Sequence, residues 1–299
     1  MFGNFFRRQY IIPYLFLAPA LLLIIIFKLY PIFIGFWESL IYTSFGGGSE
    51  NRTFVWLENY QYLFDDPIFW QSLKITAILT VIINPFQIAI SLGLALLLMR
   101  RTRYILIIRS LYLLPIGIAL PIATVIWGLM LDPYQGLVNG VIGIFGIPPQ
   151  PFLVSESQAL WSIIAIATWK GVAFWMLFLL AGLEDIPTQF YEAAQIDGAK
   201  PFQKLRYITL PLLRRTILFV FVADTAANFV LMVPMIILTK GGPMQSTNVL
   251  VYEAYRSGFY YQDWGRSLSI ISILTIITLI VIGFQLLFLG DSSRERKKL

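Results

Sequence analysis

The sequence contains neither cysteine nor histidine. Without cysteine, disulfide scaffolds and thiolate metal sites are excluded. Without histidine, the chain lacks the usual general base and metal ligand, so it can hold no Ser-His-Asp or Cys-His catalytic site. Charged residues are also scarce, at 13% of 299 residues, whereas soluble domains carry about 25%. So few charges cannot cover the surface of a soluble protein of this length.

Apolar residues, in contrast, are abundant and come in long blocks. They make up 58% of the chain, and the mean hydropathy is +0.75. A soluble protein with a large core does not need blocks of membrane length, and a spanning helix takes about 20 apolar residues. We therefore predict an all-α integral membrane protein with six transmembrane helices. The predicted spans are residues 13–37, 74–99, 109–131, 159–183, 215–238 and 266–289.

The net charge of +6 could indicate nucleic acid, but the positions of the basic residues indicate a membrane. Of the 22 Lys and Arg residues, fifteen lie on one side of the predicted spans, five on the other and two within spans. Basic loops stay in the cytoplasm, so both termini and segment 184–214 are predicted to be cytoplasmic, and no nucleic acid is expected as a partner. The fifteen are Arg7, Arg8, Arg100, Arg101, Arg103, Arg109, Lys200, Lys204, Arg206, Arg214, Arg215, Arg294, Arg296, Lys297 and Lys298.

Two apolar segments need separate interpretations. The run at residues 11–27 is long and no small-residue cleavage site follows it, so it is predicted to be the first span and not a cleavable signal peptide. Segment 134–157 is unusually apolar for an outward loop and too short for a seventh span. We expect it in the membrane interface or packed against the other helices.

A polar island interrupts the apolar blocks between the fourth and fifth predicted spans. It carries nine charged side chains from Glu184 to Arg215. Within it, residues 188–199 are predicted to form a helix, with Glu192 in its early turns and two alanines that leave a small, smooth face. Gly198 is expected to turn the chain through a conformation closed to other residues. An ordinary connecting loop would account for the basic residues, but not for this order of acid, alanines and glycine.

The order of residues in the island resembles the EAA motif of ABC importer permeases, the membrane subunits of binding-protein-dependent uptake systems. The sequence FVWLENY at 54–60 resembles the first outward loop of the maltose/glycerol-phosphate/lactose-type sugar permeases. LTKGGP at 238–243 resembles the third outward loop of the first permease of each pair. The resemblance covers nearly the whole chain. The matching positions of the island are Glu192, Ala193, Ala194, Asp197, Gly198, Ala199, Gln203, Ile208, Leu210 and Pro211.

The resemblance implies one transmembrane permease domain over residues 1–299, with a core at about 72–290, an N-terminal span at 13–37 and a coupling segment at 184–214. It implies a second homologous permease, two copies of an ABC ATPase and an extracytoplasmic solute-binding protein, in the inner membrane of a prokaryotic cell. ATP and Mg would be bound by the ATPase, because this chain has no phosphate loop. The chain itself is therefore expected to need no cofactor and to be no enzyme. The ATPase-coupling residues would be Glu192, Ala193, Ala194, Asp197, Gly198 and Ala199.

Polar residues inside the predicted spans are candidates for the solute pathway, because such residues are costly in a membrane. Lys170 lies in the fourth span, and the spacing of Asp224 and Asn228 puts them on one face of the fifth. A carboxylate and an amide together can hold sugar hydroxyls, and aromatic neighbours of Lys170 can stack on a sugar ring. The resemblance places these stretches along the cavity for a carbohydrate. The candidate pathway residues are Trp169, Lys170, Gly171, Phe174, Asp224 and Asn228.

Structural explanations stay open for each candidate. Lys170 and Asp224 could form a buried ion pair between two helices, Asn228 could bond a neighbouring helix, and the aromatic residues could pack or face lipid. If the charged residues do contact solute, a lysine together with an aspartate is more charge than a neutral disaccharide demands. This leaves open a glycosylated polyol, an amino sugar or a phosphorylated polyol.

Two other classes of membrane protein are alternatives. An ion-coupled secondary transporter acting alone would need coupling carboxylates inside the spans, and Asp224 is the one clear candidate. It would also leave the polar island without a purpose. A channel would need a polar stripe along one helix, and we expect no span to carry one. Pro85 is expected to kink the second span, and Pro115 and Pro121 the third.

Overall fold

The computed structural model describes residues 3–46, 49–100 and 102–290, with side chains at 13–42, 52–100 and 102–287. It divides into two compact units, which are described separately below. The first comprises Met1–Asp66 with Ala254–Ile273, and the second Pro67–Glu253 with Leu274–Leu299. Of the basic residues that predict the orientation, Arg101 and those after residue 290 lie outside the described residues, as do the side chains of Arg7 and Arg8.

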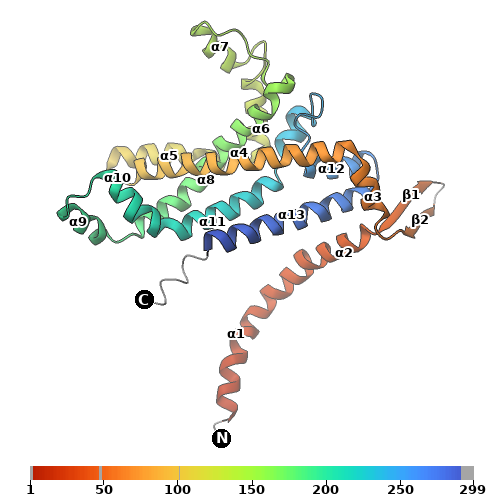
Figure 1. The fold of residues 1–299 in the computed structure, drawn as a ribbon, viewed down its shortest axis with the longest axis horizontal. Helices are drawn as coiled ribbons and strands as arrows, with labels where there is room; N and C mark the ends of the chain where they lie inside the picture. The colour runs from red at the N-terminus through yellow and green to blue at the C-terminus, as the bar shows by residue number, and fades with distance from the viewer. Residues whose placement is uncertain (1–2, 47–48, 101, 291–299) are drawn as a thin grey trace. The chain divides into compact units, whose positions relative to one another are not determined.

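The first unit begins with a continuous apolar helix and then forms a β-hairpin (Figure 1). The hairpin is antiparallel, with Ile41 opposite Phe54. Asn59 fastens it, because its Nδ2 donates to the carbonyl oxygens of Ser39 at 2.8 Å and Ile41 at 3.2 Å. The all-α prediction therefore does not hold for this hairpin. The β-forming residues of its first strand are followed by a glycine run, and glycine is disfavoured in strands, so the sequence carries only a weak strand signal. The elements are α1 (Gly3–Ile24), η1 (Ile25–Leu29), α2 (Tyr30–Glu38), β1 (Ile41–Gly46), β2 (Ser49–Phe54), α3 (Glu58–Asp65) and η5 (Arg256–Tyr260).

The second unit is built on three helices, α4, α8 and α11, which pack side by side (Figure 1). Two further helices, α12 (Leu250–Tyr255) and α13 (Trp264–Gly290), contribute residues to both units. The other elements in chain order are α4 (Pro67–Leu98), α5 (Arg103–Gly117), α6 (Leu120–Met130), α7 (Leu137–Ile144), η2 (Phe152–Val154), α8 (Glu156–Glu184), α9 (Thr188–Ile196), α10 (Pro201–Lys204), η3 (Leu205–Thr209), α11 (Leu210–Phe229) and η4 (Met235–Thr239).

Among the described residues, four helical stretches are long and apolar enough to cross a membrane. They correspond to the first, second, fourth and sixth predicted spans. Their ends agree within three residues, except that the second begins at Pro67, seven residues before the predicted start at 74. The second continues through Pro85 without a break. The chain is therefore a predominantly helical protein with several spans, as predicted. The four stretches are Pro13–Glu38, Pro67–Leu98, Glu156–Glu184 and Trp264–Leu287.

The predicted third span, 109–131, is not one straight helix. It is split into α5 and α6, which are bent by 102° with respect to each other. Ile118 and Ala119 take extended backbone conformations between them. Pro121 explains the break, because a proline near the start of a helix lacks the N–H that would bond to the preceding turn. The expected kink is thus a sharp corner.

The predicted fifth span, 215–238, is also shorter than expected. Helix α11 ends at Phe229, and a separate π-helical turn, η4, follows just after Pro234. Helix α11 is not among the four spanning stretches, because it carries three charged residues, Arg214, Arg215 and Asp224. A helix with these charges needs neighbours that supply their partners.

A polar row runs along α4, contrary to the expectation that no span carries one. Its members recur every three or four residues, so they share one face of the helix, and all are buried. Four of them bond to their own helix or to neighbours, as when Thr76 Oγ1 accepts from the Leu250 N–H at 2.7 Å, whereas the hydroxyls of Ser72 and Thr80 have no partner in the described structure. Apolar residues between them keep the mean hydropathy high, which hid the row in the sequence. The row consists of Ser72, Thr76, Thr80, Asn84, Gln87 and Ser91.

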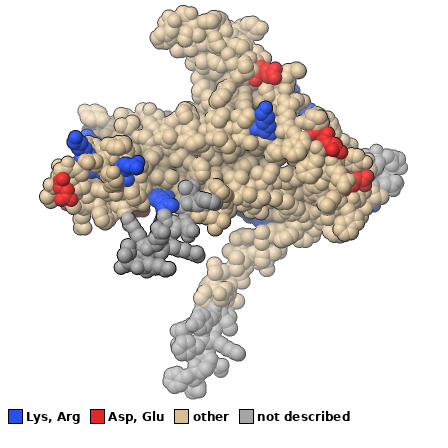
Figure 2. Space-filling view, in the orientation of Figure 1, with Lys and Arg blue, Asp and Glu red and all other residues tan. Residues whose placement is uncertain are grey.

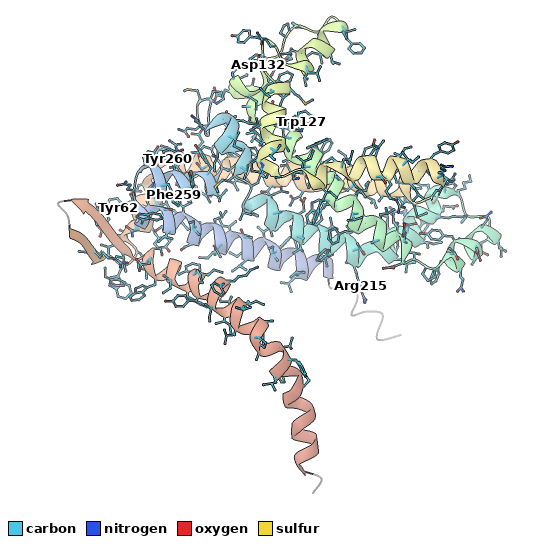
Figure 3. All side chains as sticks on the ribbon, turned by 180° about the vertical axis from the view of Figure 1, so that it is seen from behind. Tyr62, Trp127, Asp132, Arg215, Phe259 and Tyr260 are labelled. Atoms are coloured by element: carbon cyan, nitrogen blue, oxygen red, sulfur yellow. The ribbon has the colours of Figure 1, made fainter. Side chains whose placement is uncertain are left out.

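Segment 134–157 forms α7 and the short turn η2 beyond the C-terminal end of α6, where Asp132 lies (Figure 3). Asp132 accepts hydrogen bonds from the backbone N–H groups of Gln135 and Tyr134, and these lower the pKa of its carboxyl. Ile144 and Phe145 are largely exposed. Helix α7 therefore leaves apolar side chains uncovered, whereas η2 packs against α8 and η4. The segment is thus partly packed against the other helices, and its place in the membrane interface stays a prediction.

Close packing of α8 on α11 can be tested at Gly182. A Cβ there would lie 2.6 Å from Thr216 Oγ1 and 2.8 Å from Leu213 Cδ1. Gly182→Ala should therefore destabilise the protein by about 1–3 kcal/mol through overpacking, measured as a lower thermal unfolding midpoint in detergent. Gly93→Ala on α4 is the matched control, because its Cβ would meet nothing within 4 Å. Equal midpoints for the two variants would contradict this account.

Candidate functional site

The polar island folds into two short helices and a turn at one end of the second unit. Helix α9 covers Thr188–Ile196, three residues fewer than predicted. Its side chains, including Glu192 and Ala193, are mostly exposed. Tyr191 and Ala194 are half-buried, and the Tyr191 hydroxyl shares a hydrogen bond of 3.0 Å with Thr209 Oγ1. This bond joins α9 to η3, which leads directly into α11.

Gly198 ends α9 in a left-handed conformation, with φ of +73°. The Ala199 N–H donates to the Ala194 carbonyl at 2.8 Å, and the Gly198 N–H donates to the Gln195 carbonyl at 3.1 Å. These two bonds define a Schellman motif, which satisfies the last carbonyls of a helix and requires positive φ at this position. A Cβ at Gly198 would meet nothing within 4 Å. Glycine is therefore needed here for its backbone conformation, not for space.

The surface of the island combines exposed apolar side chains with basic ones. Ile196 is 88% exposed, and Phe202 and Tyr207 are each 71% exposed. Beside them a small hollow of about 300 Å³ is lined by Ala194 and Asp197, among others. Lys and Arg side chains gather around this end in Figure 2, while the helices beyond it show few charges. Exposed apolar patches rimmed by polar groups are typical of protein interaction sites.

A second polar site lies inside the helices, centred on Asp224. This carboxylate is 1% exposed, and its Oδ1 accepts from Trp175 Nε1 at 2.7 Å and Gln87 Nε2 at 2.8 Å. Asn228 Nδ2 donates to Asn84 Oδ1 at 2.6 Å. Side chains of α4, α8 and α11 thus meet in one buried hydrogen-bond network.

Two acceptors in this network have no partner in the structure, Asp224 Oδ2 and Gln87 Oε1. Unsatisfied buried oxygens are costly, so they mark places where a donor is missing. Gly171 holds Gln87 in position, because a Cβ at Gly171 would collide with the Gln87 amide. Gln87, which Gly171 holds in position, therefore helps to satisfy Oδ1 of Asp224, while Oδ2 has no donor.

The network borders a pocket of about 430 Å³. Lys170 lies in its wall, but its Nζ donates to the carbonyl oxygens of Pro115 at 3.0 Å and Ile118 at 2.6 Å. Asp224 accepts from Gln87 and Trp175, so no Lys170–Asp224 ion pair forms in the described structure. Five of the six candidate pathway residues line this pocket. They are Lys170, Gly171, Phe174, Asp224 and Asn228.

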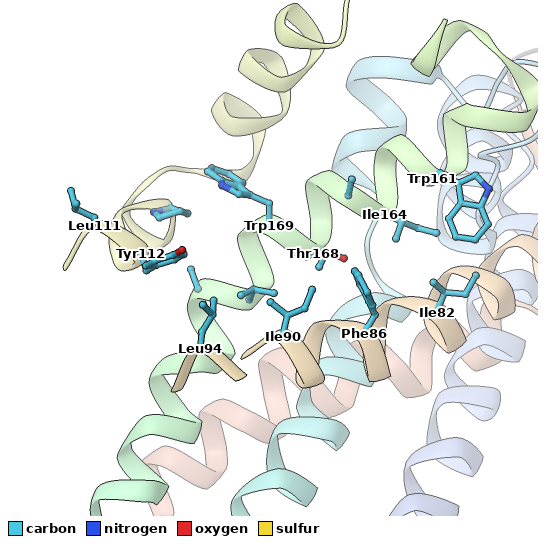
Figure 4. A pocket seen from close by; sticks show the side chains of 14 residues that line it. Ile82, Phe86, Ile90, Leu94, Leu111, Tyr112, Trp161, Ile164, Thr168 and Trp169 are labelled. Carbon is cyan, nitrogen blue, oxygen red and sulfur yellow. The ribbon is translucent and has the colours of Figure 1, made fainter. Parts of the chain in front are cut away.

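Trp169, the sixth candidate, points elsewhere. It packs edge-on against Trp127 of α6, with ring centroids 5.6 Å apart. It lines a different and larger cavity of about 920 Å³ between α4, α5 and α8. Phe86 and Ile90 of α4 face the same cavity (Figure 4), and its walls are almost entirely apolar. Trp169 therefore does not share a pocket with the charged candidates.

Sequence reasoning missed the contribution of α4 to the inner site. Asn84 and Gln87 are the two members of the polar row with the largest hydrogen-bonding capacity, and both bond to residues of α11. Their spacing of three residues, next to Pro85 in an otherwise apolar span, was the signal available. Uncharged polar residues that share one helical face within a span are therefore candidates for an inner site, as charged residues are.

Sequence comparison identifies related proteins over almost the whole chain. A family model described as "Binding-protein-dependent transport system inner membrane component" matches residues 4–292. The chain is 33% identical over 284 residues to the sn-glycerol-3-phosphate transport system permease protein UgpA of Pectobacterium atrosepticum, covering 94% of this chain and 95% of that protein. It is 32% identical over 281 residues to a probable ABC transporter permease protein of Pyrococcus horikoshii, covering 92% and 95%.

Solved structures share the fold at lower identity. A crystal structure of a bacterial ABC transporter involved in the import of the acidic polysaccharide alginate contains a chain that matches with a TM-score of 0.79 at 22% identity, over 98% of both chains. A chain from the bacterial alginate ABC transporter in complex with an alginate pentasaccharide-bound periplasmic protein matches with a TM-score of 0.77 at 23% identity, over 99% of this chain and 98% of that one. The likeness extends over nearly the whole chain.

The Schellman turn can be tested by substitution at Gly198. Gly198→Ala forces an L-residue into the left-handed region, at a cost of about 1–2 kcal/mol, so α9 should fray. Hydrogen exchange of the α9 amides should then be roughly 5- to 30-fold faster, since 1.4 kcal/mol is tenfold. Gly198→Asn is the control, because asparagine tolerates this conformation. If alanine and asparagine variants exchange at the same rate, the backbone argument is wrong.

The contact between Gly171 and Gln87 can be tested with a double-mutant cycle. Gly171→Ala should displace the Gln87 amide from Asp224 and lower stability by about 1–3 kcal/mol. Gln87→Ala removes the colliding side chain, so adding Gly171→Ala to it should cost much less than in the wild-type background. Chemical or thermal unfolding in detergent measures each step. Strictly additive effects would show that the two residues do not contact each other.

Proposed function

We propose, since the chain belongs to the family of binding-protein-dependent transport system inner membrane components, that it forms half of the translocation pathway of an ATP-driven importer. It is an ABC importer permease, and the proposed solute is a carbohydrate, either a di- or oligosaccharide or a glycosylated polyol. The observation that carries the proposal is the polar island, where an EAA-type sequence coincides with an exposed, partly apolar helix at a basic end of the unit.

In the proposed arrangement the chain spans the inner membrane of a prokaryotic cell six times, with both termini and the island in the cytoplasm. The distribution of Lys and Arg supports this orientation. The bent pair α5–α6 would be the third span and α11 with η4 the fifth. Helix α11 would be held in the membrane by the partners that α4 and α8 give to Asp224.

The proposed partners are a second, homologous permease, two copies of an ABC ATPase and an extracytoplasmic solute-binding protein. ATP and Mg would be bound by the ATPases, and this chain would remain non-catalytic. Helix α9 would dock on the ATPase through Glu192 and the small face of Ala193 and Ala194. Movement of the ATPases would then reach α11 through the bond of Tyr191 with Thr209.

The inner pocket supports a polyhydroxylated solute. Asp224 Oδ2 is an acceptor without a donor, which a sugar hydroxyl can supply, and the aromatic side chains of Phe174 and Trp175 line the same pocket. The names of the similar proteins, an sn-glycerol-3-phosphate permease and an alginate importer, favour this solute class. An ion-coupled transporter acting alone is not favoured, because it gives the island no function.

The docking role of α9 can be tested by reversing one charge. In a transporter assembled with its partner permease, ATPases and binding protein, Glu192→Lys should abolish co-purification of the ATPases and solute uptake together. Glu156→Lys makes the same change in charge at the other end of α8, and it should leave both intact.

Two outcomes would decide against the proposal. Uptake that persists after the ATPase contact is lost would refute coupling through this helix. Equal loss of ATPase binding in the Glu156 variant would show that charge in general, and not the docking helix, is responsible.

A further inference from the structure

The corner between α5 and α6 leaves backbone carbonyls without helical partners. The last four carbonyls of any helix lack donors from their own chain, and Pro121 contributes no N–H to bridge the break. Within the break, the Ile118 N–H reaches the Pro115 carbonyl only at 3.4 Å. In a membrane such groups must be satisfied by another part of the protein.

Lys170 of α8 satisfies two of these carbonyls from across the pocket. Its ammonium donates to Pro115 on one side of the break and to Ile118 within it, at 3.0 and 2.6 Å. A cation suits this position for a second reason, because the carboxyl end of a helix carries partial negative charge. Lys170 thus caps α5 in the way that a lysine of the same helix often does.

The same ammonium also faces the inner pocket. Ile116 and Leu120, one from each side of the corner, line that pocket together with Lys170. An ammonium has three donors, and the two carbonyls use two of them. Among the described residues that line the pocket, Lys170 is the single cation and Asp224 the single carboxylate. The third donor is therefore available to a group that enters the pocket.

We propose that Lys170 is a positioning residue that holds the α5–α6 corner by capping its carbonyls, and that an acidic group on the solute releases the corner by drawing the ammonium into the pocket. The inference rests on the proposed importer function and adds that the solute carries an acidic group, as a phosphorylated or carboxylated sugar or polyol does. Its hydroxyls bond to Asp224 Oδ2 while its anionic oxygens bond to Lys170. An anion outcompetes a neutral carbonyl, because hydrogen bonds between two charged groups are the stronger ones.

The corner can be observed with spin labels. The chain has no cysteine. Leu114→Cys on α5 and Leu129→Cys on α6, both at exposed positions, therefore provide the only two labelling sites in a transporter whose other subunits are cysteine-free. Distances between the labels are measured by pulsed electron resonance in nanodiscs. Lys170→Met removes the donors at similar length, and Lys170→Arg retains charge and donors.

In the wild type, sn-glycerol 3-phosphate should shift the distance distribution, whereas uncharged maltose should not. Lys170→Met should show the shifted distribution without any solute and lose the response to the phosphate. Lys170→Arg should behave like the wild type. The apparent affinity for the phosphate should fall about tenfold or more in the methionine variant, the usual loss for a hydrogen bond to a charged group.

The inference is overturned if Lys170→Met keeps the wild-type distribution and response, or if maltose shifts the corner as much as the phosphate does. Either of these outcomes can be told apart from a failure of the importer function. If only the inference about Lys170 is wrong, the ATPases still co-purify with the chain and uptake proceeds. If the wild type neither binds ATPases nor takes up solute, it is the proposed function that fails.

Discussion

A polar group inside a membrane has no water to bind, so the protein must provide its partner. The interior of the second unit depends on this constraint. The polar row of α4 reaches α11 through Asn84 and Gln87, and α8 adds the indole of Trp175. Apolar packing alone would permit the three helices to slide past one another. The need to satisfy Asp224 allows only one register, because a slip of one turn would leave a buried carboxylate without donors.

The same constraint explains why the pocket and the corner of the third span occur together. Breaking a helix inside a membrane exposes carbonyls, and these are tolerated only where protein or a polar cavity satisfies them. Lys170 does so from α8, while Asp224 faces the pocket from α11 with one oxygen free. One wall of the pocket therefore holds hydrogen bonds from Lys170 to the corner, and the other holds an acceptor without a donor. If a solute engages both, as we propose, its recognition and the change of helix geometry require the same exchange of partners.

The sequence predicts local features of this protein well and tertiary ones poorly. Hydropathy predicts the four spans, and a motif of about ten residues predicts the helix that ends at Gly198. The hairpin at Ile41 was missed because strand pairing involves residues that the glycine run separates. Gln87 was missed because its role depends on α8 and α11, which only the fold brings near. Trp169 was misplaced by its sequence neighbour Lys170, since adjacent helical residues point in different directions.

The two polar regions differ in where their partners come from. Around Asp224 most polar groups are satisfied within the chain, and two acceptors without partners, Asp224 Oδ2 and Gln87 Oε1, belong to residues that line the pocket. On α9, apolar side chains such as Ile196 remain exposed beside basic residues, and nothing in the described chain covers them. Yet the bond between Tyr191 and Thr209 ties α9 to η3, which continues into α11 and so to Asp224. A partner that covers and moves α9 therefore acts on one end of the same helical element whose middle holds the pocket together.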